Sequence, residues 1–204
     1  MQQTFMLILL IAGAYFLGSI PFGYLICKAF TGKDVRKTGS GNIGTTNVMR
    51  MVGLKGALLV FALDFLKGFV PAFLALHYGG EIFGLLIGIA AVLGHDLSIW
   101  LKFKGGKGAA TSVAVMFALM PWAGVVAMVT WAITIAITRY VSLGTCMAAV
   151  AIFIYSFVAD ISLVYKIVIY IIAVVIVFMH RSNLKRIAKG EELKVGKKKS
   201  VNTD

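Results

Sequence analysis

Residues 5–27 read FMLILLIAGAYFLGSIPFGYLIC, an apolar run without a charged side chain. About 20 such residues are enough to cross a bilayer as a helix. A cleaved signal peptide carries its positive charge before the apolar part, whereas here Lys28, Lys33, Arg36 and Lys37 follow it. Because Lys and Arg accumulate on the cytoplasmic side, this order predicts a retained first helix with the N-terminus outside.

The rest of the chain repeats this pattern. Hydrophobic residues make up 60% and charged residues 14%, against about 25% charged residues in soluble proteins. With a mean hydropathy of +0.93, a soluble globule, a disordered chain and a disulfide scaffold are excluded. Further apolar runs cover 52–78, 82–101, 109–120, 121–138, 140–159 and 161–179, with breaks at 77–81 and at Pro121. We predict an all-α integral membrane bundle of about seven helices.

The basic residues, 20 Lys and Arg against 8 Asp and Glu, set the expected topology. Seven spans place the 31–55 loop, the 102–107 loop, Arg139 and the tail on one side, together with nearly all the positive charge. The C-terminus is therefore expected in the cytoplasm, and the net charge of +12 indicates topology and not a nucleic-acid partner. We predict one domain over 1–196 and a basic, polar tail over 197–204.

Four segments on the predicted cytoplasmic side combine glycine with hydroxyl, amide and basic side chains. Glycine frees backbone N–H groups to converge on an anion, while Ser, Thr and Asn donate neutral hydrogen bonds and Lys or Arg supplies charge. This inventory suits phosphate, although tight turns and topology markers alone could also explain each loop. The segments are GSGNIGTTNVMR (39–50), KGGKG (104–108), Arg139 with Ser142, and HRSN (180–183).

The remaining sequence patterns are weaker indications of a functional site. Gly39-x-Gly41-x-x-Gly44 matches the dinucleotide fingerprint in letters but follows an apolar helix instead of a strand. Asp64 and Lys67 are three residues apart and are expected to form a structural ion pair, from which Lys67 could still reach the surface. His95 is expected to be buried, and His180 is open between a helix-dipole role and a site role. No metal cluster is visible in the sequence.

Taken together, these motifs resemble those of the bacterial PlsY-type acyl-phosphate:glycerol-3-phosphate acyltransferases. The resemblance extends from the first apolar run to Lys194. Its elements are GSIPFG (18–23), GSGNIGTTNVMR (39–50), DFLKG (64–68), GH (94–95), FKGGKGAAT (103–111) and HRSNLKRIAKGEELK (180–194).

The resemblance implies an activity and assigns roles to residues. It implies transfer of a fatty acyl group from acyl phosphate to the sn-1 hydroxyl of glycerol 3-phosphate in the bacterial inner membrane, at a site facing the cytoplasm. Acyl phosphate is already activated, so neither metal nor cofactor is expected. Catalytic roles are expected for Ser40, Asn42, Arg50, Lys104, Ser142, His180 and Asn183. Substrate-binding roles are expected for Gly41, Gly44, Thr46, Asn47, Lys67, Gly105, Gly106, Lys107, Gly108, Arg139 and Arg181.

Several points stay open at this stage. The proton of the glycerol hydroxyl goes either to His180 or to the phosphate of the substrate. The acyl chain is expected in a groove between apolar helices, near Ile20 and Phe22. The sequence does not specify the oligomeric state. A membrane transporter of phosphate or organophosphate is the alternative function, although the two pseudo-symmetric halves typical of transporters are absent from the sequence.

Overall fold

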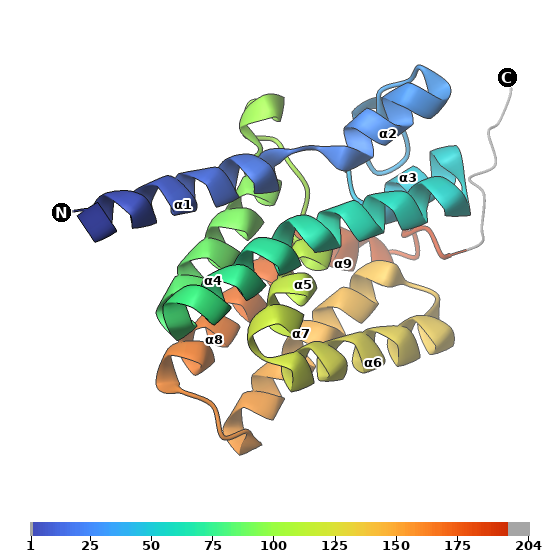
Figure 1. The fold of residues 1–204 in the computed structure, drawn as a ribbon. Helices are drawn as coiled ribbons and strands as arrows, with labels where there is room; N and C mark the ends of the chain where they lie inside the picture. The colour runs from blue at the N-terminus through green and yellow to red at the C-terminus, as the bar shows by residue number, and fades with distance from the viewer. Residues whose placement is uncertain (1, 196–204) are drawn as a thin grey trace, which may run out of the picture. The chain divides into compact units, whose positions relative to one another are not determined.

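A computed structural model describes residues 2–195 and divides the chain into two compact units, Met1–Gly124 and Val125–Asp204. Every regular element in the described part is helical (Figure 1). The first unit contains α1 (Gln2–Ser19), α2 (Phe22–Thr31), η1 (Val35–Lys37), α3 (Thr45–Val52), α4 (Leu54–Asp96), η2 (Ile99–Leu101) and α5 (Ala109–Leu119). Helix α6 (Pro121–Thr138) contains the boundary, and the second unit continues with α7 (Val141–Val158), α8 (Leu163–Met179) and α9 (Arg181–Ala188).

The first apolar run is broken at Ile20 and Pro21, so the prediction of one helix over 5–27 is wrong. Proline has no N–H to donate and disfavours the helical conformation of the residue before it. The break leaves backbone carbonyls that need donors in an apolar environment. Lys67 donates to the carbonyl of Ile20 at 2.9 Å, and Ser98 donates to that of Ser19 at 2.5 Å. Two polar side chains therefore stabilise the break.

Helix α4 bends at Gly80, where the predicted break at 77–81 is confirmed. Gly80 has φ 81° and ψ −174°, a conformation that glycine adopts far more readily than other residues. Figure 1 shows the change of direction between the two arms of α4. The second arm packs against α1, with Ala14, Ile87 and Ala90 in one buried cluster. The C-terminal end of α4 is thereby fixed beside the α1–α2 break.

A small apolar core supports both glycine-rich loops of the first unit. Ile43 and Val48 come from the first loop and α3, and Leu101 directly precedes the second loop. They share this core with Ile26, Cys27, Val35 and Val60. The two loops are therefore anchored in the same cluster, although some 60 residues of sequence separate them.

In the second unit, α7 and α8 pack through Ala149, Ala173 and Ile176. Helix α9 follows α8 after a bend of 51°. The runs predicted at 140–159 and 161–179 are confirmed as α7 and α8, and the predicted division at Pro121 is confirmed because α5 ends at Leu119 and α6 begins at Pro121.

By length and apolarity, the described residues contain four candidate membrane spans, or five if α8 and α9 are counted together. The four are Thr4–Thr31, Leu54–Leu101, Pro121–Thr138 and Val141–Val158. Helix α5 has 11 residues, about 16 Å, which is too short for a hydrocarbon core of about 30 Å. An all-helical integral membrane fold is thus supported, while the count of seven spans stays a prediction. The predicted tail over 197–204 lies outside the described residues.

Candidate functional site

The first glycine-rich loop is organised by the side chain of Asn47 in α3. Its amide group donates to the carbonyls of Val35 at 3.0 Å, Thr38 at 3.1 Å and Asn42 at 2.9 Å, and its oxygen accepts from the N–H of Ser40 at 3.0 Å. Asn47 is only 1% exposed. Its hydrogen bonds within the loop show that it holds the loop in shape, and the binding role expected for it stays a prediction.

The glycine amides of this loop are also bonded within the protein. The N–H of Gly41 donates to the carbonyl of Thr38 at 2.9 Å, and that of Gly44 donates to the side chain of Asn42 at 2.7 Å. The two amides are thus bonded within the loop, and their expected contact with an anion stays a prediction. Among the polar and charged side chains of the segment, Ser40 at its tip and Arg50 in the last turn of α3 are exposed, while Thr46 is half-buried.

The second glycine-rich loop folds back onto the end of α4. The N–H of Gly105 donates to the carbonyl of Asp96 at 3.0 Å, and that of Gly106 donates to the carbonyl of His95 at 2.9 Å. These amides complete the last turn of α4 and are bonded within the protein, and the phosphate contact expected for the two glycines stays a prediction. A Cβ at Gly108 would lie about 3 Å from both carboxylate oxygens of Asp96, so an acidic group already stands at the start of α5. Positive charge in this loop therefore comes from side chains, of which Lys104 is exposed and Lys107 half-buried.

A buried charged cluster lies beside this loop. The Nζ of Lys67 is 2.7 Å from Oδ1 of Asp64, with 2% and 3% of the two side chains exposed, so the predicted ion pair is confirmed. His95 is buried as expected, and its Nδ1 lies 3.6 Å from the same Asp64 oxygen. Lys67 faces Asp64 and the carbonyl of Ile20 and does not extend to the surface. The observed role of Lys67 is therefore structural, and its expected contact with substrate stays a prediction.

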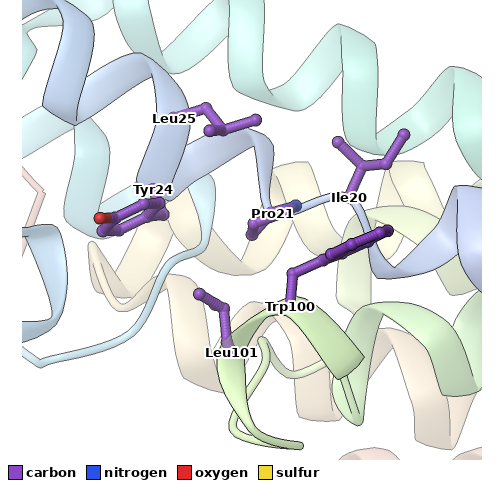
Figure 2. A pocket seen from close by; sticks show the side chains of 6 residues that line it. All are labelled: Ile20, Pro21, Tyr24, Leu25, Trp100 and Leu101. Atoms are coloured by element: carbon purple, nitrogen blue, oxygen red, sulfur yellow. The ribbon is translucent and has the colours of Figure 1, made fainter.

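An apolar pocket of about 280 Å³ opens at the α1–α2 break. Figure 2 shows Ile20 and Pro21 from the break, Tyr24 and Leu25 from α2, and Trp100 and Leu101 from η2 around it. The ring of Tyr24 also carries the guanidinium of Arg36 at 4.9 Å. Leu101 leads directly into the second loop, so the pocket adjoins the segment that carries Lys104.

Near this pocket, Arg36 is paired with Asp34. Arg36 donates to both carboxylate oxygens of Asp34, the closest contact being 2.7 Å, and this lowers the pKa of Asp34 to about 2. The carboxylate is therefore ionised at neutral pH and offsets the charge of Arg36.

In the second unit, Glu192 accepts hydrogen bonds from two of the predicted site residues, Ser142 and Asn183. Its Oε1 accepts from Ser142 at 3.3 Å and from Asn183 at 2.7 Å, while its Oε2 accepts from Arg186 at 2.7 Å. The segment around Glu192 is tied down further by the N–H of Val195, which donates to the carbonyl of Arg139 at 2.9 Å. The chain after α9 therefore returns to the α6–α7 turn and connects Ser142 with Asn183.

His180 stands between α8 and α9 and is buried. Its Nδ1 lies 2.8 Å from the carbonyl of Ile176. A carbonyl only accepts, so Nδ1 carries the proton, and Nε2 is the nitrogen that can accept one when the ring is neutral. Arg181 is exposed and lies over the ring of Phe178 at 4.0 Å, and the side chain of Arg139 is also exposed.

Within each unit the structure brings predicted residues together. In the first, the loops carrying Ser40 and Lys104 share one core, and in the second Ser142 and Asn183 share Glu192. The roles of Glu192, His95 and Asp96 were not predicted. For Glu192, the sequence signal that could have indicated its role is an acidic residue within the basic stretch 181–194. For His95 and Asp96, nothing in the local sequence shows that they face a loop. Among the described residues no His, Cys, Asp and Glu side chains form a group that could hold a metal.

Comparisons with known proteins extend over nearly the whole chain. A family model described as glycerol-3-phosphate acyltransferase matches residues 8–190. The glycerol-3-phosphate acyltransferase of Desulforamulus reducens is 39% identical over 194 residues, covering 95% of this chain and 97% of that protein. That of Aquifex aeolicus is 42% identical over 185 residues, covering 90% and 96%.

Two solved structures are similar in fold. The crystal structure of PlsY, an integral membrane glycerol 3-phosphate acyltransferase, in its glycerol 3-phosphate form has a TM-score of 0.89 at 40% identity, covering 93% of this chain and 96% of that chain. Its lysophosphatidic acid form has a TM-score of 0.85 at 38% identity, covering 93% and 95%.

Proposed function

Since the chain belongs to the glycerol-3-phosphate acyltransferase family, we propose that it transfers a fatty acyl group from acyl phosphate to the sn-1 hydroxyl of glycerol 3-phosphate. The products are lysophosphatidic acid and inorganic phosphate. The observation that carries this proposal is the similarity, over 93% of the chain, to PlsY in its glycerol 3-phosphate and lysophosphatidic acid forms.

The reaction needs positioning more than activation. The hydroxyl oxygen attacks the carbonyl carbon of the acyl phosphate, a new C–O bond forms, and the bond from that carbon to the phosphate oxygen breaks. The leaving group is phosphate, which carries the electron pair away, so no covalent enzyme intermediate is required. The protein has to hold two phosphorylated reactants together and stabilise the oxyanion of the tetrahedral intermediate.

Side chains supply the positive charge for these phosphates. The amides of Gly41, Gly44, Gly105 and Gly106 are bonded within the protein. The phosphate ligands are therefore Lys104, Lys107 and Arg50, with Ser40 as a neutral donor. The glycine-rich loops fix the backbone from which these side chains extend.

His180 is the protein group proposed to accept the hydroxyl proton. Its Nδ1 proton is directed to the carbonyl of Ile176, which leaves Nε2 as the basic nitrogen of the neutral ring. The phosphate of the substrate is the second acceptor to be tested. Asn183 and Ser142 are held by Glu192 and complete the polar site of the second unit.

The apolar pocket at the α1–α2 break suits the first part of the acyl chain. It lies beside the loop that carries Lys104, so a chain seated there has its carbonyl near the phosphate-binding cations. Seven spans with the N-terminus outside place both loops at the cytoplasmic face of the inner membrane. The concentration of Lys and Arg in these segments supports that orientation.

The proposal is tested with purified protein, acyl phosphate and glycerol 3-phosphate. Inorganic phosphate should be released only when both substrates are present. Release without glycerol 3-phosphate would indicate a hydrolase, and no release at all would favour a phosphate or organophosphate transporter.

Lys104→Ala is expected to raise the KM for glycerol 3-phosphate about ten- to hundredfold, because a hydrogen bond to a charged group contributes about 1.5–3 kcal/mol. The exposed Lys102 of the same loop is the matched control, and Lys102→Ala should leave this KM nearly unchanged. Steady-state kinetics in detergent gives both values. Full activity and unchanged glycerol 3-phosphate affinity in Lys104→Ala would refute the phosphate role of Lys104.

Trp100→Ala is expected to raise the KM for a long-chain acyl phosphate about fivefold, since losing contact with one or two methylenes costs about 1 kcal/mol. The KM for glycerol 3-phosphate should stay the same. Trp122→Ala, which removes an exposed tryptophan away from the pocket, is the control. Equal effects of the two variants on the long-chain substrate would place the acyl chain elsewhere.

A further inference from the structure

The second glycine-rich loop rests on the side chain of His95. A Cβ built on Gly106 would overlap the imidazole, and the three nearest atoms it would meet are Nε2, Cδ2 and Cε1 of this one ring. The N–H of Gly106 donates to the carbonyl of the same histidine at 2.9 Å. Gly106 therefore contacts both the backbone carbonyl and the ring of His95.

Gly105 makes a different contact. A Cβ there would overlap the backbone carbonyl of His95 and approach that of Asp96, and no side chain is among its three nearest neighbours. Neither Gly105 nor Gly106 has a positive φ, so the backbone conformation itself would accept alanine at both positions. At Gly105 a side chain is excluded by the backbone at the end of α4, and at Gly106 it is excluded by the imidazole of His95.

The ring of His95 is itself fixed from behind. Nδ1 lies 3.6 Å from Oδ1 of Asp64, and that oxygen is 2.7 Å from Nζ of Lys67. All three side chains are buried, and Lys67 is held in turn by the carbonyl of Ile20 at 2.9 Å. The imidazole therefore lies between the first arm of α4 and the loop, and the buried Asp64–Lys67 ion pair restricts its position.

From this arrangement we infer that His95 is a positioning residue for glycerol 3-phosphate, acting through Gly106 on the Lys104–Lys107 segment. The inference rests on the proposed function of that loop. The imidazole sets how far the backbone stands from α4, and this distance sets where the two lysine side chains begin. Asp64 and Lys67 keep the ring in place and do not touch substrate.

The contact predicts that adding His95→Ala improves the glycerol 3-phosphate KM of Gly106→Ala but not that of Gly105→Ala. Gly106→Ala should raise the KM for glycerol 3-phosphate about a hundredfold, since a shift of 1 Å in a positioning group can cost that much. His95→Ala should raise it about tenfold on the same ground, with the KM for acyl phosphate within about twofold of the wild type. The double variant His95→Ala/Gly106→Ala should return to the level of His95→Ala alone, because the ring that the new Cβ meets is gone.

Gly105→Ala is the matched control. Its new Cβ meets backbone carbonyls, so adding His95→Ala should give no recovery. Leu85→Ala, a buried truncation in the second arm of α4, controls for general loosening and should change both KM values alike. His95→Ser, which also empties the space of the ring, replaces His95→Ala throughout if the alanine variant does not stay monodisperse in detergent.

Turnover and direct binding of glycerol 3-phosphate by calorimetry are measured side by side. The inference is overturned if His95→Ala leaves the glycerol 3-phosphate affinity unchanged, if it alters both substrates equally, or if the double variant is no better than Gly106→Ala. A wild type that binds glycerol 3-phosphate without turnover refutes the transfer reaction, and the variants are then judged by binding. A wild type that does not bind it overturns both proposals.

Discussion

His180→Ala is expected to lower kcat by about 10²- to 10⁴-fold, the contribution usual for a positioned general base. The reason is the fixed tautomer: Nδ1 donates to the carbonyl of Ile176, so Nε2 is the nitrogen that takes the proton. The KM values should change little, because the ring is expected to act in the chemical step more than in binding.

The measurement is single-turnover release of phosphate, with thermal unfolding in detergent to show that α8 and α9 stay folded. His77→Ala removes an exposed imidazole to which no role is assigned and is the control. A decrease in kcat of less than about tenfold would assign proton acceptance to the phosphate of the substrate instead.

Lys67→Met is expected to have the largest effect on stability. The substitution removes one partner of the buried Lys67–Asp64 ion pair, a change that typically costs about 3–5 kcal/mol. It also removes the donor to the carbonyl of Ile20 at the α1–α2 break. Most of the protein should therefore be lost during extraction or should unfold at a much lower temperature.

The double variant Asp64→Leu/Lys67→Met separates charge from packing. Removing both members of a buried ion pair is often close to neutral, so most of the stability should return. Recovery will be incomplete, because the hydrogen bond from Lys67 to the Ile20 carbonyl is still missing. Thermal unfolding of the two variants and the wild type in the same detergent gives the comparison. A single variant as stable as the wild type would contradict the stabilising role given to the Lys67–Asp64 ion pair.

Much of the fold could be predicted from the sequence because apolar length and breaker residues act locally. The division at Pro121, the bend at Gly80 and the Asp64–Lys67 pair all depend on residues within a few positions of each other. The break at Pro21 was missed because residues 5–27 have the length of a single span, whereas 109–138 is too long for one helix and had to be divided.

The candidate site was harder to predict because its hydrogen bonds connect distant residues. Composition indicated phosphate-binding loops, but it could not show that the glycine amides donate to Asp96 and His95. Composition likewise could not show that the side chain of Asn47 bonds to Val35, Thr38, Ser40 and Asn42. The sequence identifies which residue types are present, and the packed chain determines which of them still face a ligand.

Asp64 and Lys67 belong to a single helix, so their pair can close as soon as that helix forms, before any other segment has arrived. A helix delivered to the insertion machinery in this state has no net charge at the pair, which reduces the cost of about 2.5–3.5 kcal/mol for each isolated charge at the bilayer centre. His95 joins only after the chain has turned back at Gly80. During biogenesis the Asp64–Lys67 pair can therefore form before the second glycine-rich loop packs against His95.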